Sequence, residues 1–352
     1  MKTLRDISTA DLKDKKIILR VDFNVPISNG KIGEMYRIDA HKKMINYLVD
    51  YGASVLLITH HSDKAQSFKD IIDQISERIG KKINLIQKKD EFSGGLALLD
   101  NIRRFEGEEQ NDEAFAQELA RGFDFYINDA FAVCHRAHAS VSAITKFIPS
   151  YVGFLIEKET EELSKAIKEP AQGKVLVLGG AKISTKLPVI RNFLDKADKI
   201  LIGGAIANNF LKAKGVDIGN SVVDDNFLDV QDLLSNEKII LSEDYEKDGD
   251  KILDIGPKGR EKFSEIISNS SMVIWNGPMG LFEDSRFKAG TDAVAQAVIK
   301  SKYSVIGGGD TIASVSPEDI NKFTFVSTGG GAMLEFLAGE KLPGLEALGY
   351  YE

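Results

Sequence analysis

The sequence predicts an α/β protein with two doubly wound (Rossmann-like) domains, mainly parallel sheets, and a long helix that joins the domains. Short apolar runs alternate along the 352 residues with segments in which apolar residues recur at helical spacing. This alternation is typical of parallel strands connected by crossover helices. The length favours about two domains. Pro149 and Pro170 flank an amphipathic segment, residues 150–167, which we expect to be the joining helix and the place of the domain boundary.

Apolar runs in the first half of the chain are expected to form strands. They cover residues 16–26, 54–59, 83–86, 96–99 and 125–129. One helix is expected after Arg37, with Gly52 as its C-cap, and others over residues 68–79 and 106–122. The acidic residues 106–112 suit the first turn of a helix, because carboxylates interact favourably with the helix dipole there.

Polar side chains collect at the carboxyl ends of these strands. They are Asp22, Asn24, His60, Arg103, His135, Arg136 and His138. In an open parallel sheet these ends lie along one edge, which is where ligands bind. Together with Arg37 they would form a basic pocket for a phosphate or carboxylate, since the planar guanidinium can bind two oxygens at once. Taken singly, each residue is also explained by a strand-end turn or a structural hydrogen bond, so the shared edge carries the prediction.

The second half repeats the alternation, but its strand ends carry glycines. Strands are expected at residues 174–178, 199–202, 239–241 and 252–257, and another begins at Met272. Glycine pairs follow the first two strands, at residues 179–180 and 203–204, which marks this half as the nucleotide-binding one. Lys182 and Lys186 are four residues apart, so on a helix they can share a face aimed at phosphate oxygens. Two solvated lysines are the alternative.

Two triple-glycine turns, residues 307–309 and 329–331, are the most distinctive feature of the sequence. Glycine lacks a Cβ and lets the backbone approach a ligand closely, and the free N–H groups of a following helix favour an anion. Asp310 offers the hard oxygen ligand that a magnesium-nucleotide needs. Either turn alone could merely shape a strand-to-helix connection, but the repetition favours phosphate binding. Neither a P-loop nor a G-x-G-x-x-G fingerprint is present, which disfavours those families.

The composition excludes several classes of protein. A net charge of −8 argues against a general nucleic-acid or membrane-surface binder. The first residues lack the apolar core of a signal peptide, and no apolar run approaches the ~18 residues of a membrane span. We therefore expect a soluble, cytoplasmic protein that binds neither nucleic acid nor membrane. The single cysteine, Cys134, excludes an internal disulfide and a cysteine-built metal site, and leaves a catalytic thiol as an open alternative.

Several blocks of the sequence together resemble those of phosphoglycerate kinases. They are Arg-Val-Asp-Phe-Asn-Val-Pro at 20–26, Asn-Asp-Ala-Phe at 128–131, His-Arg-Ala-His at 135–138, Gly-Gly-Ala-Lys at 179–182, Asp-Ile-Gly-Pro-Lys at 254–258, Trp-Asn-Gly-Pro-Met-Gly at 275–280, Gly-Gly-Gly-Asp-Thr at 307–311 and Ser-Thr-Gly-Gly-Gly-Ala at 327–332. Their order and approximate spacing are similar to that family over essentially the whole chain. The resemblance implies reversible, Mg²⁺-dependent phosphoryl transfer between 1,3-bisphosphoglycerate and ADP, which gives 3-phosphoglycerate and ATP in glycolysis and gluconeogenesis. It also implies a two-lobed, hinge-bending monomer.

The resemblance further implies how the chain and its site are divided. Residues 1–150 would bind phosphoglycerate, residues 151–337 would bind the nucleotide, and residues 338–352 would return to pack on the N-terminal domain. Phosphoglycerate would be held by Asp22, Asn24, Arg37, His60, Arg103 and Arg136. ATP or ADP would be held by Lys186, Gly203, Gly204, Asn276, Glu283, Gly308, Gly309, Asp310 and Thr311, with Asp310 also binding Mg²⁺. The transferred group would lie among the catalytic residues Arg37, Lys182, Gly330 and Gly331.

Residues 60–64 depart from the family pattern. They read His-His-Ser-Asp-Lys where the family usually has histidine-leucine-glycine-arginine-proline, so Asp63 replaces an arginine that would border the substrate. We expect Asp63 to weaken phosphoglycerate binding and Lys64 to compensate only in part, because a lysine cannot reproduce a two-pronged arginine contact. The chain is also shorter than usual members, through trimmed segments after Lys64 and between residues 228 and 254.

Two classes of function are compatible with these features, an active kinase and a two-lobed binding protein without catalysis. The presence of Lys182, Asp310 and both glycine turns favours the enzyme. Phosphoryl transfer depends mainly on positioning and on neutralising charge. An acyl phosphate leaves a carboxylate that needs no proton, so we expect the histidines to bind or orient substrate rather than act as general bases.

Overall fold

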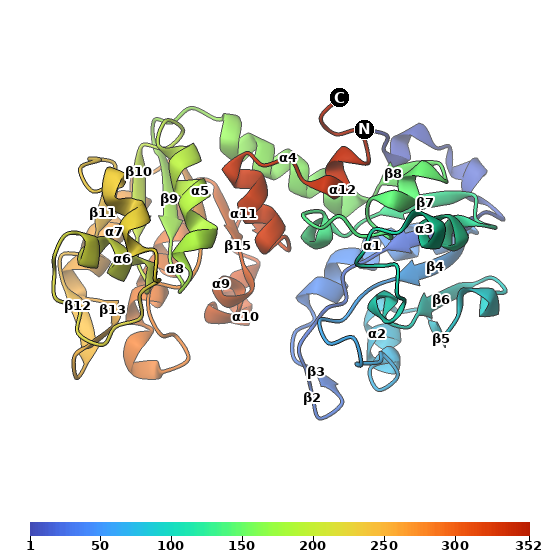
Figure 1. Ribbon diagram of the computed structural model, residues 1–352, viewed down its shortest axis with the longest axis horizontal. Helices are drawn as coiled ribbons and strands as arrows, with labels where there is room; N and C mark the ends of the chain where they lie inside the picture. Colours follow the sequence, from blue (N-terminus) through green and yellow to red (C-terminus); the bar gives the residue numbers. More distant parts are fainter. The chain divides into compact units, whose positions relative to one another are not determined.

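The computed structural model describes residues 1–352, and the chain divides into two compact units (Figure 1). Unit 1 comprises Met1–Thr160 and Lys341–Glu352, and unit 2 comprises Glu161–Glu340. The division falls inside helix α4 (Phe154–Lys168), so a single helix leads from unit 1 into unit 2. The two ends of the chain meet in unit 1, where the Met1 amine donates a hydrogen bond to the Gly349 carbonyl at 3.0 Å (Figure 1).

Unit 1 is built on a six-stranded parallel sheet of order β5-β6-β4-β1-β7-β8. In chain order the strands are β1 (Lys16–Arg20), β4 (Ser54–Ile58), β5 (Asn84–Ile86), β6 (Leu96–Leu99), β7 (Phe125–Asn128) and β8 (Ser150–Val152). Their residues are apolar nearly throughout because both faces are covered. Leu19 packs with the helices at residues 36–50 and 72–79 on one face, whereas its neighbour Ile18 packs with the helix at residues 113–120 on the other.

The helices of unit 1 are α1 (Tyr36–Asp50), α2 (Ile72–Ile79), α3 (Glu113–Ala120) and α12 (Pro343–Glu346), of which α2 and α3 are shorter than the sequence predicts. The prediction of a helix from residue 106 was wrong because the Asp112 side chain accepts the Phe115 backbone N–H at 2.6 Å and caps the helix there. Helix α2 likewise begins at Ile72 rather than at residue 68. Helix α1 has Tyr51 as its C-cap, and the predicted cap Gly52 follows it with φ +83°.

The predicted joining helix, residues 150–167, is a strand followed by a helix. Ser150–Val152 pairs in parallel with β7, and α4 begins only at Phe154. Gly153 separates the two elements, and its backbone N–H donates to the Asn128 carbonyl at 2.7 Å. The open edge of β7 therefore decides the conformation of a segment whose pattern alone fits a helix.

Unit 2 contains a second six-stranded parallel sheet, of order β11-β10-β9-β14-β15-β16. Its strands are β9 (Lys174–Leu178), β10 (Lys199–Ile202), β11 (Ile239–Leu241), β14 (Met272–Asn276), β15 (Ser304–Gly307) and β16 (Phe325–Ser327). The helices are α5 (Ile183–Phe193), α6 (Ile206–Ala213), α7 (Pro257–Ser268), α8 (Ala289–Lys300), α9 (Gly309–Ser314), α10 (Pro317–Ile320) and α11 (Gly331–Ala338). The core on one face gathers around Trp275, whose indole N–H donates to the Gly277 carbonyl at 2.8 Å.

Several short elements lie outside the two sheets. The strand predicted at residues 252–257 is β13 (Lys251–Ile255), which pairs antiparallel with β12 (Tyr245–Asp248) in a separate hairpin. It ends at Ile255 because Pro257 begins α7. A small hairpin in unit 1 joins β2 (Ile27–Ser28) to β3 (Lys31–Ile32). Short 3₁₀ helices occur at Leu4–Asp6, Thr9–Leu12, Lys89–Glu91, Ile102–Arg104, Phe131–Val133, Ala143–Lys146, Phe227–Leu233 and Ser285–Phe287.

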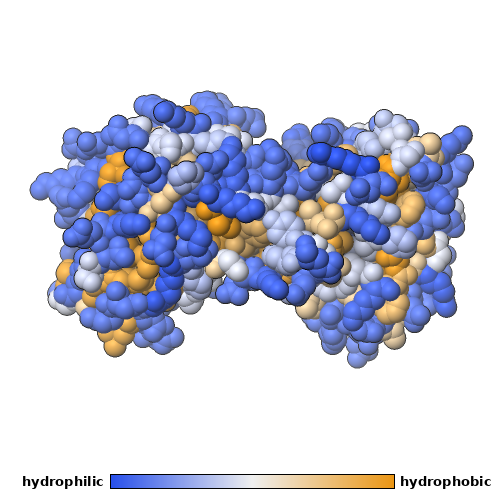
Figure 2. All heavy atoms as spheres, turned by 90° about the horizontal axis from the view of Figure 1, so that it is seen from above, coloured by the Kyte–Doolittle hydropathy of each residue, from blue (hydrophilic) through white to orange (hydrophobic).

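Figure 2 shows polar side chains over most of the face it presents, with small separate apolar patches between them. None of the helices is both long and apolar enough to cross a membrane.

Candidate active site

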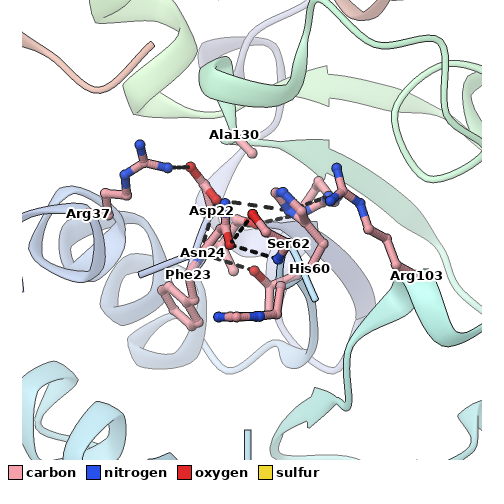
Figure 3. Close-up of polar contacts among 12 residues, drawn as sticks. Asp22, Phe23, Asn24, Arg37, His60, Ser62, Arg103 and Ala130 are labelled. Carbon is pink, nitrogen blue, oxygen red and sulfur yellow. Dashed lines mark hydrogen bonds and ion pairs between the residues drawn. The ribbon is translucent and has the colours of Figure 1, made fainter. Parts of the chain in front are cut away.

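The carboxyl edge of the unit 1 sheet brings the predicted polar residues together. Asp22 and Asn24 follow β1, His60 follows β4, and Arg103 lies in the turn after β6. Figure 3 shows these side chains with Arg37 of α1 converging on one region. We refer to Asp22, Asn24, Arg37, His60, Arg103 and Arg136 as the unit 1 site. Their convergence follows from the parallel sheet, because every strand ends at the same edge.

Asp22 is at the centre of the unit 1 site. The Arg37 guanidinium donates from Nη1 to Asp22 Oδ2 at 2.7 Å, and the Asn24 backbone N–H donates to Asp22 Oδ1 at 3.1 Å (Figure 3). Burial, the largest single influence, would by itself raise the pKa of Asp22, but the Arg37 charge acts with the other neighbouring groups and the Asn24 N–H to outweigh burial, and the pKa is lowered. Asp22 is therefore a carboxylate, and it holds Arg37 at the edge of the site.

His60 is neutral and buried beneath the site. Its Nδ1 lies 3.3 Å from Nη2 of Arg20, a residue that sequence reasoning did not single out. Because a guanidinium can only donate, Nδ1 must accept and Nε2 must carry the proton. Burial, together with the Arg20 charge, lowers the pKa of His60 well below its ordinary value. The ring thus presents an N–H donor at Nε2, which has no hydrogen-bond partner in the protein and is not a fully buried atom.

The remaining cations of the unit 1 site crowd one another. Burial, and then the charge of Arg136, lower the pKa of Arg103. Arg136 donates from Nε to Nε2 of His135 at 3.2 Å, and burial followed by Arg136 lowers the pKa of His135 to about 4. The pKa of His138 is also lowered to about 4, by burial and then by Arg103. Guanidinium groups held close together beside neutral histidines are suited to binding an anion of more than one negative charge.

The loop at residues 60–64 is closed by hydrogen bonds of its own. Asn24 Oδ1 accepts from the backbone N–H and the hydroxyl of Ser62, at 2.9 and 3.1 Å. The Asp63 carboxylate is exposed and accepts the Ala65 backbone N–H at 2.9 Å. Lys64 lies 2.5 Å from Glu109 Oε2.

Glu109 also approaches Arg103 of the unit 1 site, with Oε1 3.3 Å from Nε. Lys64 and Arg103 therefore share one carboxylate, and Lys64 contributes no free charge to the site.

The predicted phosphate-binding residues of unit 2 line one cavity. It is bordered by Gly180, Lys182, Lys186, Asn276, Gly277, Gly308, Gly309, Asp310, Thr311, Gly330 and Gly331. These residues come from the carboxyl ends of β9, β14, β15 and β16. Gly308 and Gly330 have φ of +101° and +53°, a region that glycine enters without the strain a side chain would bring. We call this space the glycine-turn cavity.

Two predicted ligands of the nucleotide mainly hold the glycine turn in place. The Thr311 hydroxyl donates to the Gly307 carbonyl at 2.8 Å and accepts the Gly277 N–H at 2.7 Å. The Asn276 amide donates to the same Gly307 carbonyl at 2.8 Å. Their polar atoms therefore fix the backbone that borders the cavity.

The two lysines face the glycine-turn cavity from different positions. Lys182 precedes α5 as its N-cap residue, whereas Lys186 lies in the first turns of α5, so they do not share a helix face as predicted. Both still line the cavity. Burial lowers the pKa of Lys186, and the Asp310 carboxylate partly opposes that shift. The cavity thus combines two ammonium groups with one carboxylate.

A second, more apolar cavity adjoins the first and shares Gly180, Ala181 and Asp310 with it. Its other lining residues are Gly204, Ala205, Val222, Tyr245, Ile252, Leu253, Asp254, Ile255, Pro278, Met279, Gly280, Leu281, Phe282 and Glu283. Gly203 lies behind this wall, because a Cβ there would come within 2.5 Å of the Met279 sulfur. Tyr245 and Val222 were not predicted; they come from a stretch without a recognisable motif.

The glycine-turn cavity offers one carboxylate, that of Asp310, for a metal ion. No group of three or more His, Cys, Asp or Glu side chains is arranged to bind a metal. Magnesium in phosphate-transfer sites is commonly bound by one or two carboxylates together with substrate phosphates. The exposed Asp310, which borders both cavities, fits that mode of binding.

Comparisons with known proteins show what the whole chain is similar to. The family model described as phosphoglycerate kinase matches residues 6–340. A phosphoglycerate kinase of Dictyoglomus turgidum is 40% identical, over 99% of this chain and 98% of its own, and one of Wolbachia pipientis wMel is 41% identical, over 97% and 98%. The solved structure of the phosphoglycerate kinase from Pyrococcus horikoshii OT3 has a TM-score of 0.87 at 33% identity, over 99% of this chain and 98% of that chain. That from Coxiella burnetii has a TM-score of 0.82 at 34% identity, over 96% and 97%.

Proposed function

The chain belongs to the phosphoglycerate kinase family, and from this we propose how its residues perform the reaction. It is a glycolytic phosphotransferase that moves a phosphoryl group reversibly between 1,3-bisphosphoglycerate and ADP, giving 3-phosphoglycerate and ATP.

We assign phosphoglycerate to the unit 1 site. The domain, predicted as residues 1–150 with 338–352 packed on it, corresponds to unit 1, Met1–Thr160 with Lys341–Glu352. The ligands are Asp22, Asn24, Arg37, His60, Arg103 and Arg136. The crowding of Arg103 and Arg136 supports this assignment, because a phosphate or carboxylate would relieve the repulsion between two guanidinium groups. His60, with its proton on Nε2, would donate a further hydrogen bond to the anion.

The nucleotide is assigned to the domain predicted as residues 151–337, which corresponds to unit 2, Glu161–Glu340. The phosphates would lie in the glycine-turn cavity, bound by Lys186, Asn276, Gly308, Gly309, Asp310 and Thr311. The base and ribose would lie in the adjoining cavity, bordered by Gly203, Gly204 and Glu283. Asp310 would hold Mg²⁺, which supplies positive charge to the phosphate oxygens when it is bound.

Catalysis would require charge neutralisation around the transferred phosphoryl group. Lys182, Gly330 and Gly331 border the glycine-turn cavity and would meet that group from the nucleotide side, and Arg37 from the phosphoglycerate side. No general base is needed, because the group that accepts the phosphoryl from ATP is already a carboxylate. The neutral, arginine-bonded His60 and His135 accord with roles in binding.

We further propose that the enzyme bends at a hinge along α4, works as a monomer and resides in the cytoplasm. A single chain carries both halves of the proposed site, so no second subunit is needed to complete it. Its one cysteine, Cys134, is buried and forms no disulfide, which suits a reducing compartment. The absence of a basic surface excess and of a membrane-spanning helix gives no reason to expect nucleic-acid or membrane partners.

Lys182, Lys186 and Asp310 line one cavity. This observation favours an active kinase over a binding protein without catalysis. A coupled assay for ATP-dependent phosphorylation of 3-phosphoglycerate tests it, with Mg²⁺ and with EDTA. Magnesium-dependent turnover is expected. Binding of both substrates without turnover would instead identify a degenerate kinase kept for an interaction.

A further inference from the structure

A buried histidine outside the proposed ligand set lies directly behind Asp22. The side chain of His41 on α1 is 1% exposed. Its Nε2 accepts the backbone N–H of Asp22 at 2.9 Å, and its Nδ1 lies 2.7 Å from Oδ2 of Asp129, whose carboxyl group is fully buried. The edge of the ring meets Phe23 with centroids 5.9 Å apart. His41 thus connects α1 with the segments that follow β1 and β7.

These contacts fix both the charge and the tautomer of His41. A backbone N–H can only donate, so Nε2 must be the unprotonated nitrogen. The proton therefore sits on Nδ1 and is donated to Asp129. In a doubly protonated ring Nε2 would carry a hydrogen and could not accept the N–H of Asp22, because two donors would face each other. The ring is therefore neutral.

Helix α1 holds Asp22 at both its backbone and its carboxylate. Arg37 and His41 are four residues apart, on one face of α1. Arg37 bonds the Asp22 carboxylate at 2.7 Å, and His41 bonds the Asp22 backbone N–H at 2.9 Å. Helix α1 therefore restrains both the backbone and the side chain of Asp22 relative to Arg37. A constraint of this kind reduces the loss of conformational freedom when a ligand binds.

The second oxygen of Asp129 extends the chain of hydrogen bonds to the start of α4. Its Oδ1 accepts the backbone N–H of Leu155 at 2.8 Å, in the first turn of that helix. Gly153 allows the approach, because a Cβ at that position would lie 2.2 Å from Asp129 Oδ1. The Asp129 carboxylate thus accepts hydrogen bonds both from the first turn of α4 and from His41, which in turn bonds Asp22.

We propose that His41 is a positioning residue for phosphoglycerate binding: with Asp129 it sets Asp22 and Arg37 in their binding geometry and ties that geometry to the first turn of α4. The inference rests on the proposed assignment of phosphoglycerate to the unit 1 site.

The first test measures binding rather than turnover. His41→Ala should raise the Kd for 3-phosphoglycerate by about tenfold, since a buried hydrogen-bond partner is lost next to the ligand. The Kd for ATP should stay unchanged. Met44→Ala is the matched control, because Met44 is equally buried on α1 but belongs to the apolar core of unit 1 and offers no N–H or O–H group to Asp22. It should lower the Tm without changing the Kd for 3-phosphoglycerate.

The outcomes separate this inference from the site assignment. If Arg37→Ala weakens 3-phosphoglycerate binding and His41→Ala does not, the positioning role is overturned while the site assignment stands. If Arg37→Ala leaves binding unchanged, the unit 1 site itself is wrong. An equal loss in Met44→Ala and His41→Ala would show that general loosening of α1 explains both.

The second test works on the unaltered enzyme, so it does not depend on a variant that folds. Nitrogen-15 NMR of the histidine rings at neutral pH should show His41 with its proton on Nδ1 and a bare Nε2. A proton on Nε2, or on both nitrogens, would overturn the proposal.

Asp129→Asn tests the link to α4. The asparagine oxygen can accept from His41 or from Leu155, but its NH₂ group cannot take the place of the second acceptor. The variant should weaken 3-phosphoglycerate binding several-fold and speed hydrogen exchange of the Leu155 amide. Wild-type binding together with wild-type exchange would overturn the link.

Discussion

Arg20 donates a hydrogen bond from Nη2 to Nδ1 of His60, across 3.3 Å of buried space. The contact joins the last residue of β1 to the segment after β4, and burial together with the Arg20 charge lowers the pKa of His60 well below its ordinary value, so the ring is a neutral donor near neutral pH. Arg20 is itself held by the hydroxyl of Ser140, which accepts from Nε at 3.0 Å. The charge of the unit 1 site therefore comes from its arginines and from Asp22, not from histidine.

The KM for 3-phosphoglycerate should accordingly show no histidine titration between about pH 6 and 8, the range in which an ordinary histidine changes charge. The pKa of His60 is lowered well below that range, so its charge does not change there. Initial rates at constant ionic strength across this range check the prediction. A KM that rises as pH passes through about 6.5 would mean that His60 binds as an imidazolium.

Stability should respond to pH in a definite direction. The unfolded chain binds protons at His135 and His138 as pH falls below their ordinary value of 6.5, whereas the folded chain does so only near their folded pKa of about 4. The stabilisation is thus present above 6.5 and is lost as pH falls toward about 4. Urea unfolding at pH values on either side of this window measures it. His138→Gln should flatten the dependence, and an unchanged slope would contradict the assignment.

Lys182 should act on the transferring phosphoryl group more than on bound nucleotide. Lys182→Ala should lower kcat by ~10²-fold or more, because loss of one charge partner of the transition state commonly costs several kcal/mol. Lys300→Ala, an exposed lysine at the end of α8, is the control and should leave kcat unchanged. Steady-state kinetics decide: a raised KM for ATP with unaltered kcat would make Lys182 a ground-state binding residue.

Asp63→Arg should lower the KM for 3-phosphoglycerate several-fold, since a charge-assisted hydrogen bond contributes about 1.5–3 kcal/mol before ordering costs. The Asp63 carboxylate is exposed and bonded only to the Ala65 backbone, so its replacement breaks no ion pair. Asp11→Arg makes the same charge change at an exposed position of another segment and should not alter the KM. Kinetics at fixed ionic strength are required, because salt screens an exposed charge. Equal KM values for Asp63→Arg and wild type would place the loop outside the site.

Gly204→Ala should destabilise unit 2 by more than ~1 kcal/mol, through both backbone strain and crowding. Its φ is +59°, and a Cβ would lie 2.6 Å from the Gly180 nitrogen. Gly215→Ala separates the two causes, because Gly215 has φ +79° but open space around its Cα. Chemical denaturation should show a clearly smaller loss for Gly215→Ala. Similar losses would mean that strain alone accounts for the effect.

Hinge closure should appear as a smaller radius of gyration when both substrates are bound. Phosphoryl transfer between ligands held by different lobes requires the lobes to approach. Small-angle X-ray scattering with 3-phosphoglycerate and a non-hydrolysable ATP analogue, together and singly, tests this. No compaction at saturation of both sites would exclude closure as the step that assembles the site.

Sequence reasoning located the strands and their polar ends because buried parallel strands are short, almost wholly apolar and followed by turns. It failed where a neighbour decides the conformation. Residues 150–152 carry an amphipathic pattern that fits a helix, yet they form β8 because the edge of β7 is open to pairing. Tyr245–Asp248 was missed because this hairpin strand is only partly buried and lacks a long apolar run.

The supporting residues of the unit 1 site were harder to predict than its ligands. His41 and Asp129 are 88 residues apart in the chain, and Arg20 and Ser140 are 120 apart. Neither pair has a local pattern that relates its members. A weak local signal did exist, since His41 lies one helical turn after Arg37. Only the fold shows that the His41 side chain on this helix points toward Asp22 and Asp129.

A ribosome finishes unit 1 only after it has made all of unit 2. Gly344 donates its N–H to the Cys134 carbonyl at 2.8 Å, and the fully buried Leu345 lies in the same short helix, α12. Ribosomes add roughly 5–20 residues per second. The surface of unit 1 on which α12 packs therefore stays uncovered for many seconds while Glu161–Glu340 is translated. During that time the nascent first unit exposes apolar surface to chaperones and proteases. A chain released before Lys341 would lack α12 and would keep that surface exposed. Chaperones and proteases would then recognise premature termination late in the message through unit 1, the domain that was synthesised first.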